Sequence, residues 1–239
     1  MAKIISLGIS ARKDSILELI FSGNSSNLEA LLQNPNFSTP LWLIVWDPNV
    51  MNAIANSSTA MNAVINSQTA LNAIRNNTTV WNTFINSTIN VKEVPTMVSN
   101  TAPEGVASAS SISGSTYNAF RAFDKNTNTY WQAGGDAPQW IQYQFVSPVF
   151  VHTITLIGWG ASGNSFNPTS ITIQASDNGS TFIDIQTFNQ EFTSTPTTLY
   201  IAKQGYYRYW RVKVNYTVGG YYYYPTIREL NFKGFIQPT

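Results

Sequence analysis

The sequence contains no cysteine and a single histidine among its 239 residues. Without cysteine there are no disulfide bonds and no cysteine nucleophile, and one histidine excludes a zinc site built on several. His152 lies between apolar residues of a predicted strand, so we interpret it as structural. The 12 carboxylates show no spacing that indicates a glycosidase pair, and there is no glycine-rich phosphate loop. The sequence therefore predicts that this protein is not an enzyme.

Charged residues are scarce as well. They make up 10% of the chain and the net charge is +1, whereas about 25% is usual for a soluble domain. No basic patch is present, so we expect no nucleic-acid partner. Arg208, Arg211 and Lys213 are too few to form the basic border of a membrane-binding surface, so we expect no membrane partner either. Asn, Ser, Thr and Tyr provide the polar surface instead, which suits sugar recognition and proteins exposed on particles.

Long apolar runs and an export signal are also missing. The most apolar run, residues 41–46, is six residues long, whereas a membrane-spanning helix needs about 20. The first eight residues lack the apolar core and the cleavage site of a signal peptide. We therefore expect synthesis in a cytoplasm without conventional export. A virion, which is assembled inside its host and released by lysis, fits this expectation.

Residues 1–49 contain two segments with helical character, residues 15–21 and 27–33. The second has Ser26 or Asn27 as its N-cap and stops before Pro35. A segment this short buries its apolar residues poorly on its own. We interpret residues 1–49 as an attachment or oligomerisation region, and the alternative is a small satellite packed on the main domain.

Residues 50–89 are four copies of a ten-residue repeat, in which Asn recurs at positions 52, 62, 72 and 82. In one continuous helix, ten residues would rotate each apolar pair by roughly 80° from the previous pair. A straight helix would therefore wind its apolar stripe around itself. Two arrangements remain: short helices, each capped by Ser or Thr and broken at Asn-Ser, or a helix supercoiled with copies of itself. We favour short helices, because Asn, Ser and Thr prefer caps to helix interiors.

Either arrangement leaves apolar faces that one copy is not expected to bury, because repeats bury their faces against neighbours. We therefore predict a homo-oligomer, with a trimer as the first choice. The repeats resemble the degenerate decapeptide repeats of bacteriophage fibre and tail proteins. That resemblance implies a part of a virion.

Residues 90–99 have the composition of a linker, and from residue 100 onward the apolar period changes to two. Residues 171–176, 210–215 and 230–233 alternate between apolar and polar side chains, which is typical of strands with one buried face. Residues 177–180, Asp-Asn-Gly-Ser, form a hairpin turn signal. The fold class is therefore mainly β, with an antiparallel β-sandwich over residues 100–239 that follows an N-terminal helical repeat region.

Three motifs in this half carry a resemblance to a known family. Residues 121–131 read RAFDKNTNTYW, residues 138–141 read PQWI, and residues 227–234 read IRELNFKG. Together they resemble a discoidin domain, also called the coagulation factor 5/8 C-type domain, whose jelly-roll sandwich is shared by many bacterial carbohydrate-binding modules. The resemblance covers residues 100–236 and implies a binding protein. It also implies that Trp131 and Trp140 pack in the sandwich core, and the alternative for these two is stacking on a ligand. We expect the same core to contain Phe145, Ile154, Ile173, Val212 and Phe232.

The same resemblance implies a structural calcium ion in the turn formed by residues 124–129. The ligands would be the Phe123 carbonyl, the Asp124 side chain, Asn126, Thr129 through its carbonyl and hydroxyl, and Glu229 from the last strand. Lys125 departs from the family pattern, which usually has glycine there. The alternative is an Asx turn held by hydrogen bonds without metal.

Two loops with aromatic residues provide candidates for a ligand site, since loops at one end of a sandwich commonly carry function. They are residues 159–167 and residues 216–225. Sugars have an apolar C–H face and a hydroxyl rim, which suit aromatic planes beside amides and hydroxyls. The alternative is that half of the tyrosines pack on the sandwich. The candidate ligand-binding residues are Trp159, Asn164, Phe166, Tyr222, Tyr223 and Tyr117.

These features together predict a bacteriophage virion fibre or appendage that is not an enzyme. Its N-terminal half would anchor and oligomerise it, and its C-terminal domain would bind host cell-surface carbohydrate. The predicted partners are further copies of the chain, other virion proteins and that carbohydrate. The alternative is a purely structural capsid or tail decoration protein that uses the sandwich for protein–protein contacts.

Overall fold

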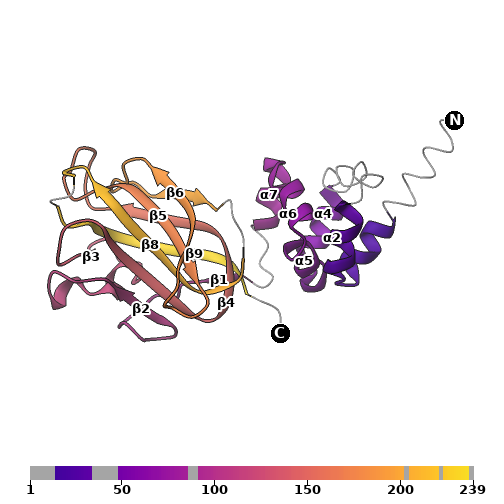
Figure 1. Cartoon of the computed structure of the whole chain (residues 1–239), viewed down its shortest axis with the longest axis horizontal. Helices are drawn as coiled ribbons and strands as arrows, with labels where there is room; N and C mark the ends of the chain where they lie inside the picture. The colour runs from indigo at the N-terminus through magenta and orange to yellow at the C-terminus, as the bar shows by residue number, and fades with distance from the viewer. Residues whose placement is uncertain (1–13, 34–47, 86–90, 202–204, 221–222, 237–239) are drawn as a thin grey trace. The chain divides into compact units, whose positions relative to one another are not determined.

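The computed structural model describes residues 14–33, 48–85, 91–201, 205–220 and 223–236 (Figure 1). The chain divides into two units, residues 1–90 and residues 91–237. The first consists of short helices and the second of strands, as Figure 1 shows.

The ten-residue repeat forms four helices of eight residues each, α4 (Pro48–Ala55), α5 (Ser58–Ile65), α6 (Gln68–Arg75) and α7 (Thr78–Ile85). The residue before a helix caps it: the Ser57 hydroxyl accepts from the Ala60 N–H, and the Ser67 hydroxyl from the Ala70 N–H. Asn77 does the same for Val80. The two residues between helices thus end one helix and begin the next, which is the favoured short-helix arrangement.

The apolar faces of these helices are buried within a single chain. Met51, Met61 and Leu71 are each at most 1% exposed. Every two-residue break redirects the chain, so successive helices turn their faces toward a shared interior instead of winding them around one axis. The premise for the trimer, that one copy leaves these faces exposed, is therefore wrong, although the oligomeric state itself stays a prediction.

The N-terminal helices complete this interior. Residues 14–21 are helical, as is α2 (Ser25–Gln33), and Ile16, Ile20, Leu28 and Leu32 are buried. Glu29 of α2 lies at the start of α6, where it accepts hydrogen bonds from the Ser67 hydroxyl (2.6 Å) and the Thr69 N–H (3.0 Å). A carboxylate at a helix N-terminus is favourable because unpaired N–H groups point toward it.

The second unit is an antiparallel sandwich. Its strands are β1 (Val91–Glu93), β2 (Val106–Ala109), β3 (Trp131–Gln132), β4 (Gln139–Gly158), β5 (Pro168–Ser176), β6 (Ile183–Asn189), β7 (Thr197–Tyr200), β8 (Tyr207–Thr217) and β9 (Thr226–Ile236). The pairing order is β1-β9-β4-β8-β5-β6, with β2 and β7 on β4 and β3 on β9. The long strand β4 joins the two layers: residues 139–144 pair with β8 and β2, and residues 149–158 pair with β9 and β7.

The predicted core residues lie inside the sandwich, with one exception. Trp131, Phe145, Ile154, Ile173, Val212 and Phe232 are each at most 1% exposed. Trp140 is the exception and corrects the prediction: Ile141 is buried, so the alternation of β4 turns Trp140 outward, where the Arg211 guanidinium lies 5.2 Å from its ring centre.

The expected linker over residues 90–99 is also corrected. Residues 91–93 form β1, which pairs with residues 233–235 of β9. Val94 and Met97 are buried in the sandwich core. This strand has only three residues, too few for an alternating pattern to reveal it.

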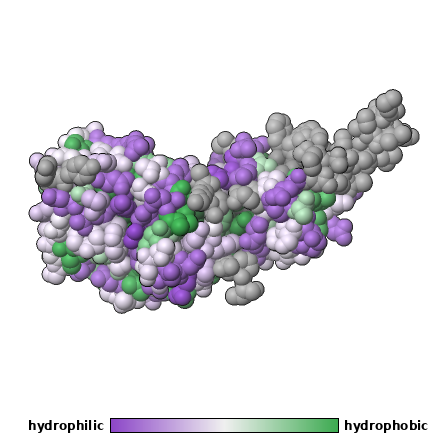
Figure 2. Space-filling model, viewed as in Figure 1, coloured by the Kyte–Doolittle hydropathy of each residue, from purple (hydrophilic) through white to green (hydrophobic). Residues whose placement is uncertain are grey.

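In the part of the chain that the structure describes, no helix is both long enough and apolar enough to cross a membrane. On the face seen in Figure 2, hydrophobic patches are small and scattered among hydrophilic and neutral residues.

Candidate functional site: an aromatic rim beside an acidic turn

Several loops meet at one end of the sandwich. The pairing brings the end of β4 beside the start of β9, and the start of β5 beside the end of β8. The loop between β4 and β5 therefore lies against the loop between β8 and β9. Three backbone hydrogen bonds join the two: Gly219 N–H to Ser165 O, Val218 N–H to Asn167 O, and Thr226 N–H to Phe166 O. We call the five rings at this end, Tyr117, Tyr130, Trp159, Phe166 and Tyr223, the aromatic rim.

Three of these rings form a continuous row. Tyr117 stacks on Tyr130 with ring centres 4.9 Å apart, and Tyr130 meets Trp159 edge-on at 4.3 Å. All three are partly exposed. Burial and a hydrogen bond with Tyr117 raise the pKa of Tyr130 to about 12, so the Tyr130 phenol is neutral at physiological pH. The row joins the predicted residues Tyr117 and Trp159 through Tyr130.

A second pair of rings lies on the two joined loops. Phe166 and Tyr223 contact each other edge-to-face with ring centres 5.7 Å apart, and Tyr223 is 39% exposed. The ring of Tyr223 lies so close to Gly219 that a Cβ there would be 2.0 Å from a ring carbon. Glycine at 219 therefore allows Tyr223 to fold over the loop. Tyr222, also predicted, lies outside the described residues.

The loop between β4 and β5 is held by polar side chains. Asn164, a predicted ligand residue, accepts from the Phe166 N–H through its side-chain oxygen (3.1 Å). Asn167 is fully buried and binds both the Gly160 N–H and the Gly160 carbonyl. Glu191 accepts from the Ser162 hydroxyl and from the Asn167 amide, and these bonds lower its pKa. These bonds fix the loop that carries Trp159 and Phe166.

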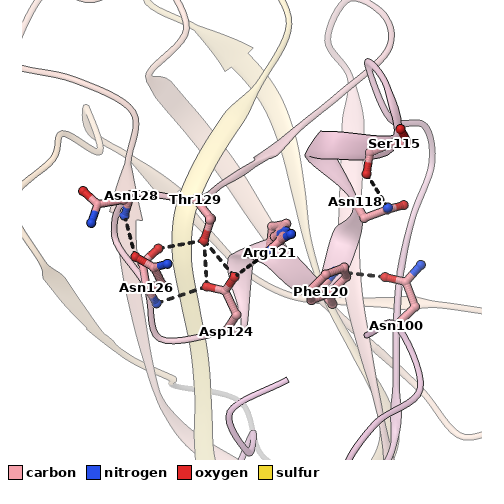
Figure 3. Close-up of polar contacts among 9 residues, drawn as sticks. All are labelled: Asn100, Ser115, Asn118, Phe120, Arg121, Asp124, Asn126, Asn128 and Thr129. Atoms are coloured by element: carbon pink, nitrogen blue, oxygen red, sulfur yellow. Dashed lines mark hydrogen bonds and ion pairs between the residues drawn. The ribbon is translucent and has the colours of Figure 1, made fainter. Parts of the chain in front are cut away.

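The acidic turn, residues 123–129, has the hydrogen bonds of an Asx turn. The Asp124 carboxylate accepts from the Asn126 N–H (3.0 Å) and from the Thr129 hydroxyl (2.7 Å), and the Arg121 guanidinium lies 3.3 Å away. Figure 3 shows Thr129 and Arg121 both directed at this carboxylate. Lys125 has φ 55°, a left-handed conformation that favours glycine. Lys125 therefore holds a backbone conformation that glycine would adopt with less strain.

Glu229 of β9 approaches the same turn, as predicted. Burial, followed by repulsion from Asp124, raises the pKa of Glu229 to about 8, although backbone N–H groups of Asn126 and Lys125 act in the opposite direction. Its Oε1 atom is buried and has no hydrogen-bond partner among the described residues. A cation would neutralise the two carboxylates and satisfy this oxygen, so the residues present fit calcium.

Other features of the turn bear on that fit. The Phe123 carbonyl, a predicted ligand, accepts from the Met97 N–H (3.0 Å) and keeps a second lone pair. No group of three or more His, Cys, Asp or Glu side chains comes together anywhere in the described ranges. A cation here would therefore depend on backbone, amide and hydroxyl oxygens together with Asp124 and Glu229, which is the donor mixture that calcium accepts.

Arg228 connects the acidic turn to the aromatic rim. Its Nη1 donates to the Thr127 carbonyl (2.6 Å) and its Nε donates to the Trp159 carbonyl (2.7 Å). Its guanidinium also lies 4.6 Å from the Trp159 ring centre. Sequence reasoning missed Arg228 and Tyr130. Both stand beside core or ligand residues of recognised motifs, and alternation from Trp131 would have placed Tyr130 on the outer side.

The described residues of the rim bring together groups suited to binding. His152, the only histidine of the sequence, is fully buried on β4, and burial together with Lys233 lowers its pKa to about 3. It is therefore neutral and structural. What the rim can present to a ligand is aromatic surface with hydroxyl and amide groups.

Comparison with known proteins agrees with this arrangement. The family model of the F5/8 type C domain matches residues 106–230, just over half of the chain. None of the curated proteins matches. Among solved structures, the chain is similar to the family 32 carbohydrate-binding module of NanJ from Clostridium perfringens in complex with galactose. The identity is 23%, the match covers 60% of this chain and 98% of that one, and the TM-score is 0.49.

Two further solved structures are similar. One is CpGH89CBM32-5 from Clostridium perfringens in complex with GalNAc-β-1,3-galactose, at 21% identity, 54% and 94% coverage, and a TM-score of 0.47. The other is chitosan-binding module 1 of a chitosanase/glucanase from Paenibacillus sp. IK-5, at 26% identity, 56% and 98% coverage, and a TM-score of 0.44.

Proposed function

This chain belongs to the F5/8 type C domain family, and we propose that its sandwich is a non-catalytic carbohydrate-binding module whose binding site is the aromatic rim. The observation that carries the proposal is the exposure of two ring clusters at one end of a rigid sandwich. Aromatic rings that are partly exposed yet held by hydrogen-bonded loops are preorganised to stack on a sugar ring.

The charges at the rim favour a neutral sugar. The cation beside Trp159, Arg228, already donates to two backbone carbonyls. The carboxylate of Glu191 is engaged by Ser162, Gly163 and Asn167. Both charged groups are therefore already engaged in holding the loops of the rim. Galactose and GalNAc-β-1,3-galactose, the ligands in the structures above, belong to those proteins, and they serve here only to select test sugars.

The acidic turn would hold a structural calcium ion through Asp124, Glu229 and the oxygens of Phe123, Asn126 and Thr129. The ion would supply positive charge that offsets the repulsion between the two carboxylates. The support is the buried, unpartnered oxygen of Glu229.

The helical unit would carry this module on a larger assembly. A single site of this kind binds weakly, at about millimolar Kd, or about −4 kcal/mol. Several copies on one particle raise the effective affinity through effective concentration. A bacteriophage appendage that contains further copies of the chain and other virion proteins provides such an arrangement. The support is the decapeptide repeat.

A glycan array probed with the full chain tests the function. We expect neutral glycans to bind, and Trp159→Ala and Tyr223→Ala each to reduce the affinity about tenfold, equivalent to about 1.4 kcal/mol. Trp140→Ala is the matched control, because Trp140 is a partly exposed tryptophan on the outer face of β4. Binding that survives both rim substitutions, or no binding to any glycan, would contradict the proposal.

A further inference from the structure

We propose that Arg228 couples the acidic turn to the aromatic rim, so that calcium bound at the turn positions Trp159 and raises the carbohydrate affinity without touching the sugar. This inference rests on the proposed function and adds a regulator to the same site. It assigns Arg228 the role of a positioning residue.

Arg228 lies at a shift in the register between β9 and β4. Glu229 pairs with Ile157 and Ile227 pairs with Gly158, so the register shifts at Arg228 and leaves it without a residue opposite on β4. Such a bulge redirects a side chain out of the regular alternation. Arg228 can therefore extend across the end of the sandwich, while its neighbour Glu229 faces Asp124.

The Arg228 guanidinium connects two backbone carbonyls that are far apart in sequence. Thr127, at the tip of the acidic turn, is 101 residues away in sequence, and Trp159 is 69 residues away. The planar guanidinium has donors in a fixed fork, so a displacement of the Thr127 carbonyl also displaces the Trp159 carbonyl or breaks one bond. The ring of Trp159 lies over the same guanidinium at 4.6 Å. Backbone and ring of Trp159 thus both depend on Arg228.

Without a cation, the acidic turn leaves one polar atom unsatisfied. The buried Oε1 atom of Glu229 has no hydrogen-bond partner among the described residues, and the left-handed backbone of Lys125 adds strain. A bound cation satisfies this oxygen and favours one turn geometry. Because Thr127 belongs to the acidic turn, a fixed turn geometry also fixes Arg228, and Arg228 then positions Trp159. Trp159 contacts Tyr130, the next ring of the rim.

The coupling is reciprocal. Coupling between two ligands typically changes affinity by about 5- to 150-fold. If calcium raises the affinity for sugar by some factor, sugar must raise the affinity for calcium by the same factor. A sugar titration with and without calcium and a calcium titration with and without sugar therefore measure the same coupling factor.

The experiment uses the full chain labelled with 5-fluorotryptophan and stripped of metal with a chelator. The Trp159 fluorine resonance is assigned by its loss in Trp159→Phe. Calcium chloride is titrated first, and galactose, N-acetylgalactosamine and chitotriose are then titrated with and without calcium. We expect calcium to shift the Trp159 resonance and to raise the affinity for the bound sugar at least fivefold.

Arg228→Met is the decisive variant, because it keeps an unbranched apolar chain of similar length and removes every donor. We expect it still to bind calcium, within about threefold of the original affinity, while the shift of Trp159 and the fivefold effect on sugar are lost. Arg211→Met is the matched control: Arg211 also lies near a tryptophan and donates through Nε, but to Gln174. It should leave the coupling unchanged. If Arg228→Met fails to fold, Arg228→Lys decides, since one ammonium cannot reproduce the fork and should reduce the coupling.

Three results would overturn the inference: no calcium binding at 10 mM calcium chloride (about tenfold above the weak limit of extracellular sites), an unshifted Trp159 resonance on calcium binding, or full coupling in the folded Arg228 variant. If calcium shifts Trp159 through Arg228 but no sugar binds, the positioning of Trp159 stands, whereas the effect on sugar affinity and the proposed function both fail. The two hypotheses are therefore separated by the order of the titrations.

Discussion

Most polar contacts that cap the helices join residues close in sequence, whereas those that hold the aromatic rim join residues far apart in sequence. Most caps in the helical unit join residues three apart, such as Ser57 with Ala60 and Ser67 with Ala70. At the aromatic rim, Arg228 joins residues that are 69 and 101 positions away. A repeat that is built from local contacts can specify a scaffold, whereas a binding rim forms only when distant loops have been brought together by the sheet.

The largest expected effect is a loss of stability in the sandwich that the helical unit does not share. Trp131→Ala removes a fully buried ring from the sandwich and should cost about 3–5 kcal/mol. We expect the unfolding of the sandwich, followed by near-ultraviolet circular dichroism in urea, to shift to much lower urea. Helical ellipticity from the repeat unit should keep its own midpoint. A common shift of both signals would contradict the division into two independent units.

The next comparison is the response to pH in calcium-free buffer. The pKa of Glu229 is raised from 4.5 to about 8, so the folded sandwich keeps a proton that the unfolded chain releases. Its stability should therefore fall as pH rises from about 4.5 to 8, by on the order of 2 kcal/mol because Glu229 is partly solvated. Glu229→Gln should flatten this pH profile. An unchanged profile in that variant would contradict the assignment of the pH dependence to Glu229.

Glu29 should give the helical unit the opposite response. Burial alone would raise its pKa, but hydrogen bonds from Ser67, Thr69 and Gln33 outweigh this and lower it below 4.5. The stability that Glu29 contributes is therefore present above pH 4.5 and lost as pH falls through the lowered pKa. Chemical denaturation from pH 3 to 6 measures it, and Glu29→Gln is the control that should remove the loss.

A smaller effect compares two caps within the repeat. Ser67 caps α6 and also donates to Glu29, whereas Ser57 caps α5. Ser67→Ala should cost about 2 kcal/mol and Ser57→Ala about 1 kcal/mol. Equal losses in thermal unfolding would mean that the contact with Glu29 contributes nothing to stability.

The smallest effect concerns the acidic turn. Lys125→Gly relieves a left-handed backbone, which favours the folded state, but it also frees the unfolded chain. We expect a net stabilisation of about 0.5 kcal/mol in the sandwich transition. Lys125→Ala keeps the strain and should be neutral. A destabilised Lys125→Gly variant would show that the lysine side chain itself holds the turn.

The difference between the units also explains what could be predicted from sequence. The ten-residue period and the Ser and Asn caps are local signals, and they predict the short helices of α5 and α6. The period does not reveal how the helices turn relative to one another, so the predicted exposure of their apolar faces was wrong. Burial of Met61 depends on a redirection of the chain at each Asn-Ser pair, which no periodicity encodes.

In the sandwich, the recognised motifs predicted that Asp124 and Glu229 meet and that Trp131 is buried. Trp140 was assigned to the wrong face, because a motif match does not fix which side of β4 faces inward. Arg228 was missed because its role depends on a bulge and on two loops far away in sequence.

We propose that the sandwich, and not the helical unit, holds a carbohydrate at its aromatic rim. Isothermal titration of the segment 91–239 with the best glycan from the array, beside the full chain, tests it most directly. We expect the same affinity per site in both samples, within about twofold, and a loss of about tenfold in Trp159→Ala. A segment that folds but binds no glycan that the full chain binds would contradict the claim.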